Sequence, residues 1–514
     1  MTQYINQAEY REQMIPEYQG NPLIEALPPI LSNQEIIQTL AEDALYNAGE
    51  RELDAQYRMH CIHRLFRYFQ PLEQHIDIAQ RISRSIRQGY LYRNPLLPDH
   101  AGKLAEGYNI LREKGNYQQL RGNRTRASGF TIIGVSGVGK STAVERILET
   151  YPQTITHSSY KETPLSMMQV VWLKLDCPHD GSLKQLCYQF FHELDQAIGT
   201  GYFDIYMKRT YTLDALLIIM TQLVRQFQIG LLVIDEIQHL SEAKGGGSDK
   251  MLNFFVTLVN TIGVPVVLIG TTKAMSLLQG EFRQARRGSG QGDLIWDRMA
   301  KDAAWSLFVR SMWRYQWTKT VIPLTTELSE VLYDESQGII DIAVKLYAIV
   351  QIDAITSGKE SFSVEDIHRT AVKKLALVKP MLDALRSGDK KKILKYGDIT
   401  PVSIEDYLSS YQMPVGEVER KTPEQKLSVM EQTVIKLMEV DVSPGAARKL
   451  AGRVAASHKN PITVGQAFKE AYQMYLSDTL VKTEKEEKQE NKDIRKSDSY
   501  EDMKQSGLVD DTEW

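Results

Sequence analysis

The 514-residue sequence predicts an α/β fold with a parallel central sheet, a helical lid after it and mainly α-helical extensions at both ends. Two nearly uninterrupted apolar stretches, 229–234 and 264–270, are typical of parallel strands that are buried on both faces. A third apolar run, 130–133, is followed by a glycine-rich loop and then by a segment with helical spacing, 141–150. Strands that alternate with helices in this way favour a sheet covered by helices on both sides.

The glycine-rich loop reads Gly-Val-Ser-Gly-Val-Gly-Lys-Ser and has the spacing of a phosphate-binding loop. Its glycines let the backbone turn N–H groups toward a phosphate, while Lys140 reaches the β- and γ-phosphates and the Ser141 hydroxyl can ligate Mg²⁺. A chance Lys-Ser after a glycine-rich turn is the alternative, but the flanking strand and helix favour nucleotide binding. The predicted ATP-binding residues here are Gly134, Val135, Ser136, Gly137, Val138, Gly139, Lys140, Ser141 and Thr142.

Two acids end the apolar stretch that begins at residue 229. Asp235 is expected to hold Mg²⁺ together with Ser141, and Glu236 is expected to orient and polarise the attacking water. An ordinary acidic turn is the alternative. The phosphate-binding loop about a hundred residues upstream argues against it.

Polar residues follow the next apolar stretch, and an arginine cluster lies further on. Thr271 or Thr272 is the candidate sensor of the γ-phosphate, although a turn with hydroxyl capping explains either residue equally well. Arg286 or Arg287 is the candidate arginine that one subunit presents to the nucleotide of the next, because a planar guanidinium suits phosphate oxygens. The alternative for this cluster is a solvated helix face.

The bulk composition limits the class of protein. With 42% hydrophobic and 25% charged residues the chain is expected to be a globular protein of several domains, without membrane insertion, in the cytoplasm. Its three cysteines have no metal-binding spacing, which fits a reducing compartment. The formal net charge of −4 means that any DNA-binding surface must be a local basic stripe.

Changes in pattern along the chain predict five regions. The Pro-rich arm, 1–34, is expected to be ordered only when a partner or neighbouring subunit holds it. The stretch 151–164 is interpreted as a Pro/Ser/Thr-rich connection, and a second strand is predicted at 169–175. The basic stretch from Lys373 to Lys395 is interpreted mainly as a solvated linker, with contact to DNA phosphates as the alternative. The regions are an N-terminal arm and helical region that contacts partners (1–120), an α/β core (121–300), a helical lid (301–378), a C-terminal helical extension (379–480) and a charged tail expected to be disordered (481–514).

Two further segments have open interpretations. The segment 81–93 contains four arginines, Arg81, Arg84, Arg87 and Arg93, together with Tyr90 and Tyr92. Basic and aromatic residues together suit contact with nucleic acid or a partner protein. The alternative is a solvated helix face followed by a capping loop. In the tail, apolar residues stand among acids at 508–514, which suggests a short docking motif.

The combination of phosphate-binding loop, Asp235-Glu236, sensor strand, arginine cluster and helical lid resembles the AAA+ P-loop ATPases. More narrowly, three segments resemble the transposition regulator ATPases of the TnsC/TniB family. These are 267–273 (Val-Leu-Ile-Gly-Thr-Thr-Lys), 176–184 (Asp-Cys-Pro-His-Asp-Gly-Ser-Leu-Lys), and Phe-Gln-Pro-Leu at 69–72 with Gly-Tyr-Leu-Tyr-Arg-Asn-Pro at 89–95.

This resemblance implies an ATPase that assembles on double-stranded DNA as a homo-oligomeric ring, a hexamer or heptamer, or as a helical filament in the bacterial nucleoid. It implies a DDE transposase and a target-selection protein of the TniQ/TnsD type, or a CRISPR complex, as partners, and ATP hydrolysis that disassembles the filament. Lys184, Thr200 and Lys244 are the implied DNA-contacting residues, in that order. A replication initiator or helicase loader of the same fold is the alternative, as is a scaffold that binds ATP without hydrolysing it.

One position departs from the AAA+ pattern. Many such lids place an arginine after a glycine, whereas Gly338 is followed by no arginine and Lys345 is the nearest cation. Either Lys345 substitutes for the arginine or the lid makes no such contact.

Overall fold

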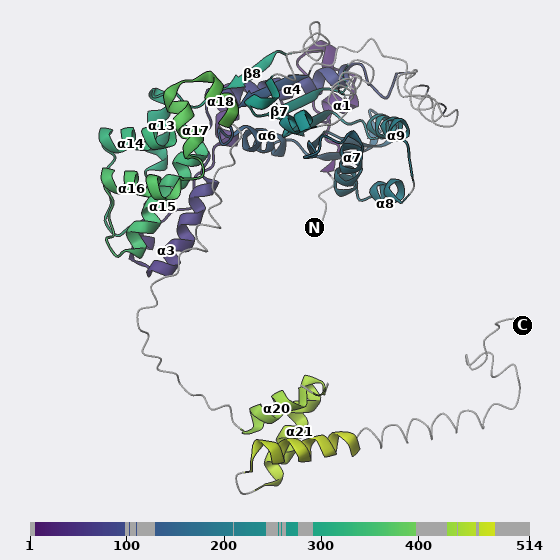
Figure 1. The fold of residues 1–514 in the computed structure, drawn as a ribbon. Coiled ribbons are helices and arrows are strands. Elements are labelled where there is room, and N and C mark those ends of the chain that lie inside the picture. Colours follow the sequence, from purple (N-terminus) through teal and green to yellow (C-terminus); the bar gives the residue numbers. More distant parts are fainter. Residues whose placement is uncertain are drawn as a thin grey trace, which may run out of the picture. The chain divides into compact units, whose positions relative to one another are not determined.

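The computed structural model describes residues 6–97, 129–208, 210–242, 264–275, 291–396, 429–438, 442–458 and 462–477, with a few single positions between them. The chain divides into two compact units, Met1–Met413 and Pro414–Trp514 (Figure 1). In the described part of the chain no helix is long and apolar enough to cross a membrane.

A five-stranded sheet forms the centre of the first unit. Its strand order is β5-β6-β7-β2-β8, and every neighbouring pair is parallel, as the sequence predicts. The edge strand β8 was not expected from the sequence, because its four residues have no long apolar run. The strands are β2 (Phe130–Gly134), β5 (Trp172–Asp176), β6 (Leu231–Asp235), β7 (Val266–Gly270) and β8 (Asp293–Trp296).

Helices cover both faces of this sheet, and alternate residues of each strand point to opposite sides. In β6, Leu231 and Val233 join the core that contains α4 (Glu73–Leu91) and α6 (Lys140–Glu149). Leu232 and Ile234 join a second core, formed with α7 (Leu183–Ile198) and α9 (Leu213–Gln226). Burial on both faces explains why these strands are continuously apolar in the sequence.

The N-terminal arm is ordered on its own chain, so the expectation that it needs a partner or neighbouring subunit is wrong. Leu23, Ile24 and Leu27 are fully buried, and α1 (Pro22–Glu25) begins with a side-chain cap from Asn21. Strand β1 (Asn6–Gln7) pairs with a strand of the same molecule. The apolar residues between the prolines provide enough burial to order the arm.

The stretch 151–164, interpreted from the sequence as a connection, contains most of a β-hairpin instead. Strands β3 (Thr154–Tyr160) and β4 (Thr163–Val170) are antiparallel, and Lys161 and Glu162 between them have φ of 45° and 68°. The strand predicted at 169–175 is divided between the end of β4 and β5. Alternating polar residues conceal the hairpin in the sequence, because one face of it stays partly exposed.

The basic and aromatic segment 81–93 is buried at Arg87, Tyr90 and Arg93, whereas Arg84 and Tyr92 are exposed, so the three buried residues are not available to nucleic acid and do not form a solvated face. The Tyr90 hydroxyl donates to the carbonyl oxygen of Gln228 at 2.8 Å, and Arg93 Nη1 donates to that of Ile229 at 2.6 Å. Arg87 is 1% exposed. These residues fasten α4 to the edge of the sheet by binding backbone carbonyl groups.

The segment before α4 contacts the lid. It contains α2 (Asn33–Leu40) and α3 (Ala55–Ile62), and Figure 1 shows α3 beside the lid helices. Arg58, 2% exposed, forms a bidentate ion pair with Glu360, with both N–O distances 2.7 Å, and also donates to the carbonyl oxygen of Trp317. The N-terminal region therefore connects the sheet, through α4, with the lid, through α3.

The lid follows β8 and is helical as predicted. Two helices, α17 and α18, continue the packing beyond residue 378, and Met381, Leu382 and Leu385 are buried in the same core. The basic stretch between Lys373 and Lys395 is thus mostly helical rather than a linker. The lid helices are α13 (Ala303–Met312), α14 (Thr326–Ser336), α15 (Ile340–Thr356), α16 (Val364–Lys374), α17 (Lys379–Ser387) and α18 (Lys390–Tyr396).

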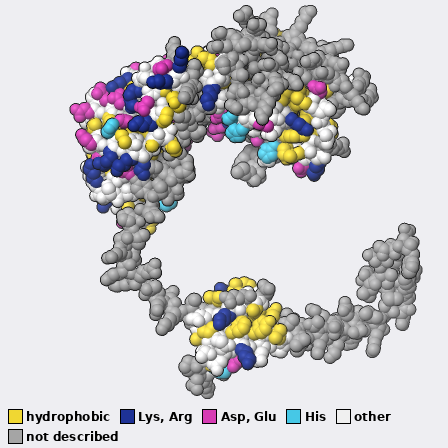
Figure 2. Space-filling view, viewed as in Figure 1, with side chains coloured by type: hydrophobic (Ala, Val, Ile, Leu, Met, Phe, Trp, Pro, Cys, Tyr) yellow, Lys and Arg dark blue, Asp and Glu magenta, His cyan; other side chains and the backbone are white. Residues whose placement is uncertain are grey.

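The second unit is a small helical body. It contains α20 (Val429–Met438), α21 (Pro444–Ser457) and a further helical segment at 464–477, packed around Leu437, Leu450 and Val454. Hydrophobic side chains gather on the face of this unit seen in Figure 2. The charged tail 481–514 lies outside the described residues.

Candidate nucleotide-binding site

The phosphate-binding loop joins β2 to α6 at the carboxyl end of the sheet. Gly137 and Gly139 have φ of 82° and 100°, a left-handed conformation that glycine adopts without strain. Gly134 is required for a different reason, because a Cβ there would lie 2.1 Å from the backbone oxygen of Trp296 in β8. Val135 and Val138 are buried under the loop, whereas Ser136, Ser141 and Thr142 are partly or fully exposed.

Lys140 lies inside this loop. It is 7% exposed, and its Nζ donates to the carbonyl oxygens of Gly134 at 3.0 Å and Val135 at 2.9 Å. Lys140 is also the first residue of α6, so the free N-terminal amides of that helix begin where the loop ends. Ser141 and Thr142 follow in the same first turn, so the loop and helix together present cationic and N–H donors.

Asp235 is the last residue of β6 and is 3% exposed. Its Oδ2 lies 3.4 Å from Nζ of Lys174 in the neighbouring strand β5, and the same ammonium group pairs with Glu145 at 2.8 Å and Asp176 at 3.4 Å. Although burial opposes the charged form, the hydrogen bond to Glu145 and the charges of Asp235 and Asp176 raise the pKa of Lys174. Lys174 was not predicted from the sequence, because only the register of β5 against β6 places it beside Asp235.

Glu236 follows Asp235 with an unusual backbone conformation. Its φ is 55°, which is strained for a residue other than glycine, and its N–H donates to Asp235 Oδ1 at 2.8 Å. The Gln238 amide donates to Glu236 Oε2, and Gln238 Oε1 accepts the N–H of Thr271 at 3.0 Å. Gln238, which is 4% exposed, thus connects the carboxylate of Glu236 to the backbone N–H of Thr271, the first residue after β7.

Thr271 and Thr272 lie at the same edge of the sheet. Both hydroxyl oxygens are buried and have no hydrogen-bond partner. Buried hydroxyl groups normally have one, so these two atoms are suited to meet a bound ligand or an ordered water.

The lid reaches the loop through the start of α15. The Asp341 N–H donates to the carbonyl oxygen of Gly137 at 3.2 Å, and Lys345 forms an ion pair with Asp341 at 2.8 Å. Burial raises the pKa of Asp341, while Lys345 opposes that shift. Arg298, which the sequence analysis also missed, fastens the segment after β8 to the lid by donating to the carbonyl oxygens of Gln337 and Leu385, both at 3.3 Å.

The two predicted DNA contacts that the structure describes lie at opposite ends of α7. Lys184 lies in the first turn of α7, exposed, with Nζ 5.8 Å from the ring centre of Tyr188. Thr200 follows the other end of α7, about 24 Å away along a 16-residue helix. Its hydroxyl donates to Asp195 at 2.6 Å. Lys244, like Arg286 and Arg287, lies outside the described residues.

A histidine pair lies beside the acids and was also missed by the sequence analysis. His179 Nδ1 and His239 Nε2 are 3.0 Å apart, and they connect the segment after β5 to the segment after β6. No group of three or more metal-ligating side chains occurs within the described ranges.

The side chains at this edge fit a magnesium nucleotide. The fit rests on the buried ammonium of Lys140, the carboxylate of Asp235 and the two buried, unsatisfied threonine hydroxyl groups. Cations and N–H groups suit phosphate oxygens, and carboxylate and hydroxyl oxygens are the ligands that Mg²⁺ prefers.

Comparison with known proteins agrees with this geometry. Residues 123–278 match the family described as the AAA domain. Among solved structures, the chain is similar to the Orc1 protein of Aeropyrum pernix in complex with DNA, with 12% identity, a TM-score of 0.35, and coverage of 75% of this chain and 85% of that one.

Two further structures show a similar degree of likeness. Cdc6p of Pyrobaculum aerophilum has 13% identity and a TM-score of 0.34, over 61% of this chain and 85% of that one. The RuvB Holliday junction branch migration motor of Thermotoga maritima has 11% identity and a TM-score of 0.29, over 62% and 95%. A comparison with curated proteins found no match. The match to the AAA domain over residues 123–278 and the parallel sheet show an AAA+ P-loop fold in this chain.

Proposed function

We propose that this protein is an ATP-dependent, DNA-binding AAA+ regulator of DNA transposition. In this proposal it oligomerises on duplex DNA, links a target-selection protein to a DDE transposase, and hydrolyses ATP to disassemble. The observation that carries the ATPase part is the placement of Lys140, Asp235, Glu236 and Thr271 at the carboxyl edge of one sheet. The transposition part is supported by the three sequence segments that resemble the TnsC/TniB family.

Each side chain at the edge has a role that its contacts suggest. Lys140 exchanges the carbonyl oxygens of Gly134 and Val135 for phosphate oxygens when nucleotide binds. Ser141 and Asp235 hold Mg²⁺, which neutralises charge on the phosphates when it is bound. Lys174 pairs with Asp235, Glu145 and Asp176, so it would hold the Asp235 carboxylate in position at the site where Mg²⁺ would bind.

Glu236 is the residue proposed to orient and polarise water. Gln238 occupies its Oε2, so Oε1 is the oxygen that accepts a hydrogen bond from water and then its proton. Thr271 and Thr272 supply hydroxyl groups beside the same water and phosphate. The lid senses the nucleotide through the start of α15, where Asp341 binds the loop backbone, while Lys345 is engaged with Asp341.

Assembly is proposed to complete the site. Arg286 or Arg287 of one subunit would stabilise negative charge at the nucleotide of the next, so ATP at each interface favours a ring or filament. For DNA, Lys184 is the first candidate because it is exposed in a first helical turn. Thr200 is weaker because its hydroxyl already binds Asp195. Lysine, arginine, aspartate and glutamate side chains intermingle on the lid face in Figure 2, so that face is a poor candidate for tracking phosphates.

The decisive experiment uses the full chain and the Glu236→Gln variant with duplex DNA. Negative-stain electron microscopy and sedimentation should show nucleotide-dependent oligomers on DNA for both proteins. The variant should retain ATP and remain assembled, because it binds the nucleotide but cannot polarise water. Rapid phosphate release by the variant would contradict the role of Glu236, and a protein that stays monomeric with every nucleotide would contradict the proposal.

A second experiment separates transposition from other DNA-linked roles. The ATP-bound protein on DNA is incubated with a purified DDE transposase, or with a replicative helicase. Retention of the transposase and stimulation of phosphate release by it are the expected results. Retention of the helicase alone would replace the transposition proposal with a helicase-loading function, while the ATPase assignment would remain.

A further inference from the structure

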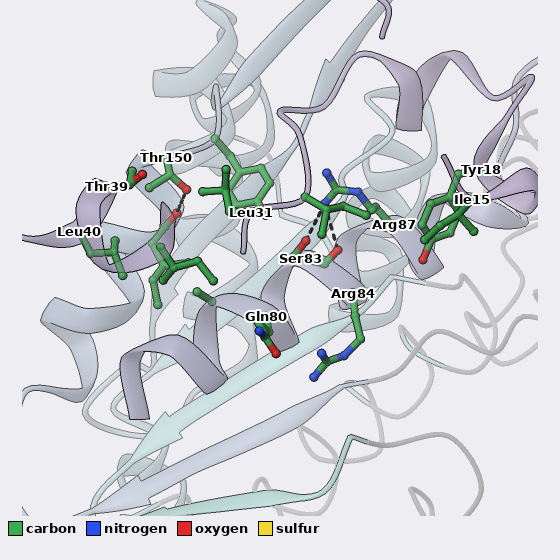
Figure 3. A pocket seen from close by; sticks show the side chains of 15 residues that line it. Ile15, Tyr18, Leu31, Thr39, Leu40, Gln80, Ser83, Arg84, Arg87 and Thr150 are labelled. Atoms are coloured by element: carbon green, nitrogen blue, oxygen red, sulfur yellow. Dashed lines mark hydrogen bonds between the residues drawn. The ribbon is translucent and has the colours of Figure 1, made fainter. Parts of the chain in front are cut away.

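A cavity of about 370 Å³ lies within the first compact unit, between the N-terminal arm, α2, α4 and the end of α6 (Figure 3). Its walls are mainly apolar and include Tyr18, Leu31, Ile36, Leu40 and Ile147. The volume is at the lower end of the range for small-molecule pockets, about 300–1,000 Å³. At about 30 Å³ for each water-sized group, such a space holds roughly a dozen non-hydrogen atoms. The cavity therefore has the size of a small organic molecule rather than of a helix or strand.

The wall of this cavity formed by α4 carries a buried cation. Arg87 is 1% exposed, and its Nη1 donates to the backbone oxygen and the hydroxyl of Ser83, as the dashed lines in Figure 3 show. Its Nη2 donates to the carbonyl oxygen of Pro28, while its Nε has no hydrogen-bond partner. All of these acceptors are uncharged, so the charge of Arg87 has no carboxylate partner among the described residues. Because buried charges in proteins are normally paired, this wall suits an anion.

A second cation lies on the same wall. Arg84, one turn before Arg87 in α4, is exposed and lines the cavity, and its Nε donates to Gln291 Oε1 at 3.3 Å. Both arginines act on Tyr18. Burial and the charge of Glu17 raise the pKa of the Tyr18 phenol, and the charges of Arg87 and Arg84 oppose that rise. The positive potential of α4 therefore reaches the part of the cavity that Tyr18 lines.

The number of free N–H groups indicates which anion fits. The contacts with Ser83 and Pro28 use at most three of the five N–H groups of the Arg87 guanidinium, which leaves Nε–H and at least one other. Two N–H groups in a planar fork match the two oxygens of a carboxylate. A phosphate monoester would bring more charge and a third oxygen into a mainly apolar space, where these groups are costly to bury.

An apolar cavity with positive charge on one wall suits a ligand that is divided in the same way. We propose that this cavity is a binding site for a small carboxylate with an apolar chain, such as a medium-chain fatty acid. The chain of the ligand fills the space among Leu31, Ile36 and Leu40, and its carboxylate pairs with Arg87 and Arg84 at the α4 wall. The proposal is independent of the ATPase and transposition assignments.

The test measures binding of decanoate to the full-length protein at neutral pH by isothermal titration calorimetry. Decanoate has the size that the cavity holds, and decan-1-ol is its matched control because it has the same chain without the charge. Decanoate is expected to bind at one site, and decan-1-ol is expected to bind at least tenfold more weakly. Equal affinity of the two compounds, or no binding of decanoate, would overturn the proposal.

Matched variants at two exposed isoleucines locate the binding site. Ile30 lines the cavity and is 52% exposed, and Ile30→Glu should weaken decanoate at least tenfold because it adds a like charge. Ile37, on α2, is 39% exposed and does not line the cavity, so Ile37→Glu should leave the affinity unchanged. Equal effects of the two variants would place decanoate elsewhere and overturn the assignment.

Arginine variants test the pairing with the carboxylate. Arg87→Met removes the buried charge and keeps an apolar chain, so the affinity for decanoate should fall to that for decan-1-ol while circular dichroism stays unchanged. Arg84→Gln should weaken decanoate and leave decan-1-ol unaffected. Unchanged affinity for decanoate in the folded Arg87→Met protein would overturn the proposed pairing. If that variant does not fold, Arg84→Gln and the pair at Ile30 and Ile37 still decide the question.

Discussion

The pH dependence of unfolding should reveal a single buried histidine at the start of α4. His75 is 2% exposed, and its Nδ1 accepts the N–H of Leu72 at 2.7 Å. Its ring packs against Phe69 and Trp296, with centres 4.8 and 5.1 Å away. Burial, with a smaller contribution from the positive charge of Arg146, lowers the pKa of His75 from 6.5 to about 4.

The sign of the effect follows from the lowered pKa. Between pH 6.5 and 4 the unfolded chain binds a proton at His75 and the folded chain does not, so stability falls as the pH falls through this window. The difference between 6.5 and about 4, at 1.36 kcal/mol per pH unit, corresponds to about 3 kcal/mol when the transition is complete. Between pH 7 and pH 5, the titration of His75 should lower the free energy of unfolding by about 2 kcal/mol.

The assay compares urea unfolding of the wild type and the His75→Gln variant at both pH values. A glutamine at this position can still accept the Leu72 N–H, as in a capping box, but does not titrate. Tryptophan fluorescence follows the first unit, which contains every tryptophan except Trp514. Between pH 7 and pH 5, the free energy of unfolding of the variant should fall by about 2 kcal/mol less than that of the wild type. The exposed His60→Gln substitution should behave like the wild type, and identical pH dependence in all three proteins would refute the reasoning.

Four further substitutions test the site and the N-terminal connection. Lys140→Ala should abolish binding of a fluorescent ATP analogue, and an unchanged dissociation constant would remove the phosphate-binding role. Gln238→Ala should lower kcat between about 10- and 100-fold while KM changes little, because Glu236 loses its positioning contact; a change in KM alone would argue against this. Lys184→Ala should weaken the binding of the protein to duplex DNA equally for all DNA sequences. It should also reduce by about one the slope of the logarithm of the binding constant against the logarithm of the salt concentration, as titrations at several salt concentrations would show. Arg58→Ala should destabilise the first unit by about 3 kcal/mol because it leaves the paired carboxylate of Glu360 without its partner; chemical unfolding that shows less than 1 kcal/mol would contradict this.

Local patterns in the sequence were enough to predict the parallel sheet, the helical lid and the candidate residues at the sheet edge. The phosphate-binding loop could be predicted from the spacing of Gly134 to Ser141 alone, because the turn, the ammonium group and the start of the helix all lie within eight positions. Asp235 and Thr271 were predicted for a similar reason, since each directly follows a continuous apolar strand. Their catalytic and binding roles stay predictions.

Contacts between distant segments were decided only by the tertiary structure. Lys174 lies beside Asp235 because β5 and β6 are adjacent, and Gln238 reaches Thr271 because β7 follows β6 in the sheet, although 33 residues separate them in the chain. The N-terminal arm is held in part by the pairing of β1 with β3, a strand that lies more than a hundred positions later in the chain. Arg87 is buried for the same reason, because segments distant in the chain cover it. The local sequence determines which residues share a face of a helix. The tertiary structure determines which of these faces is covered by other segments.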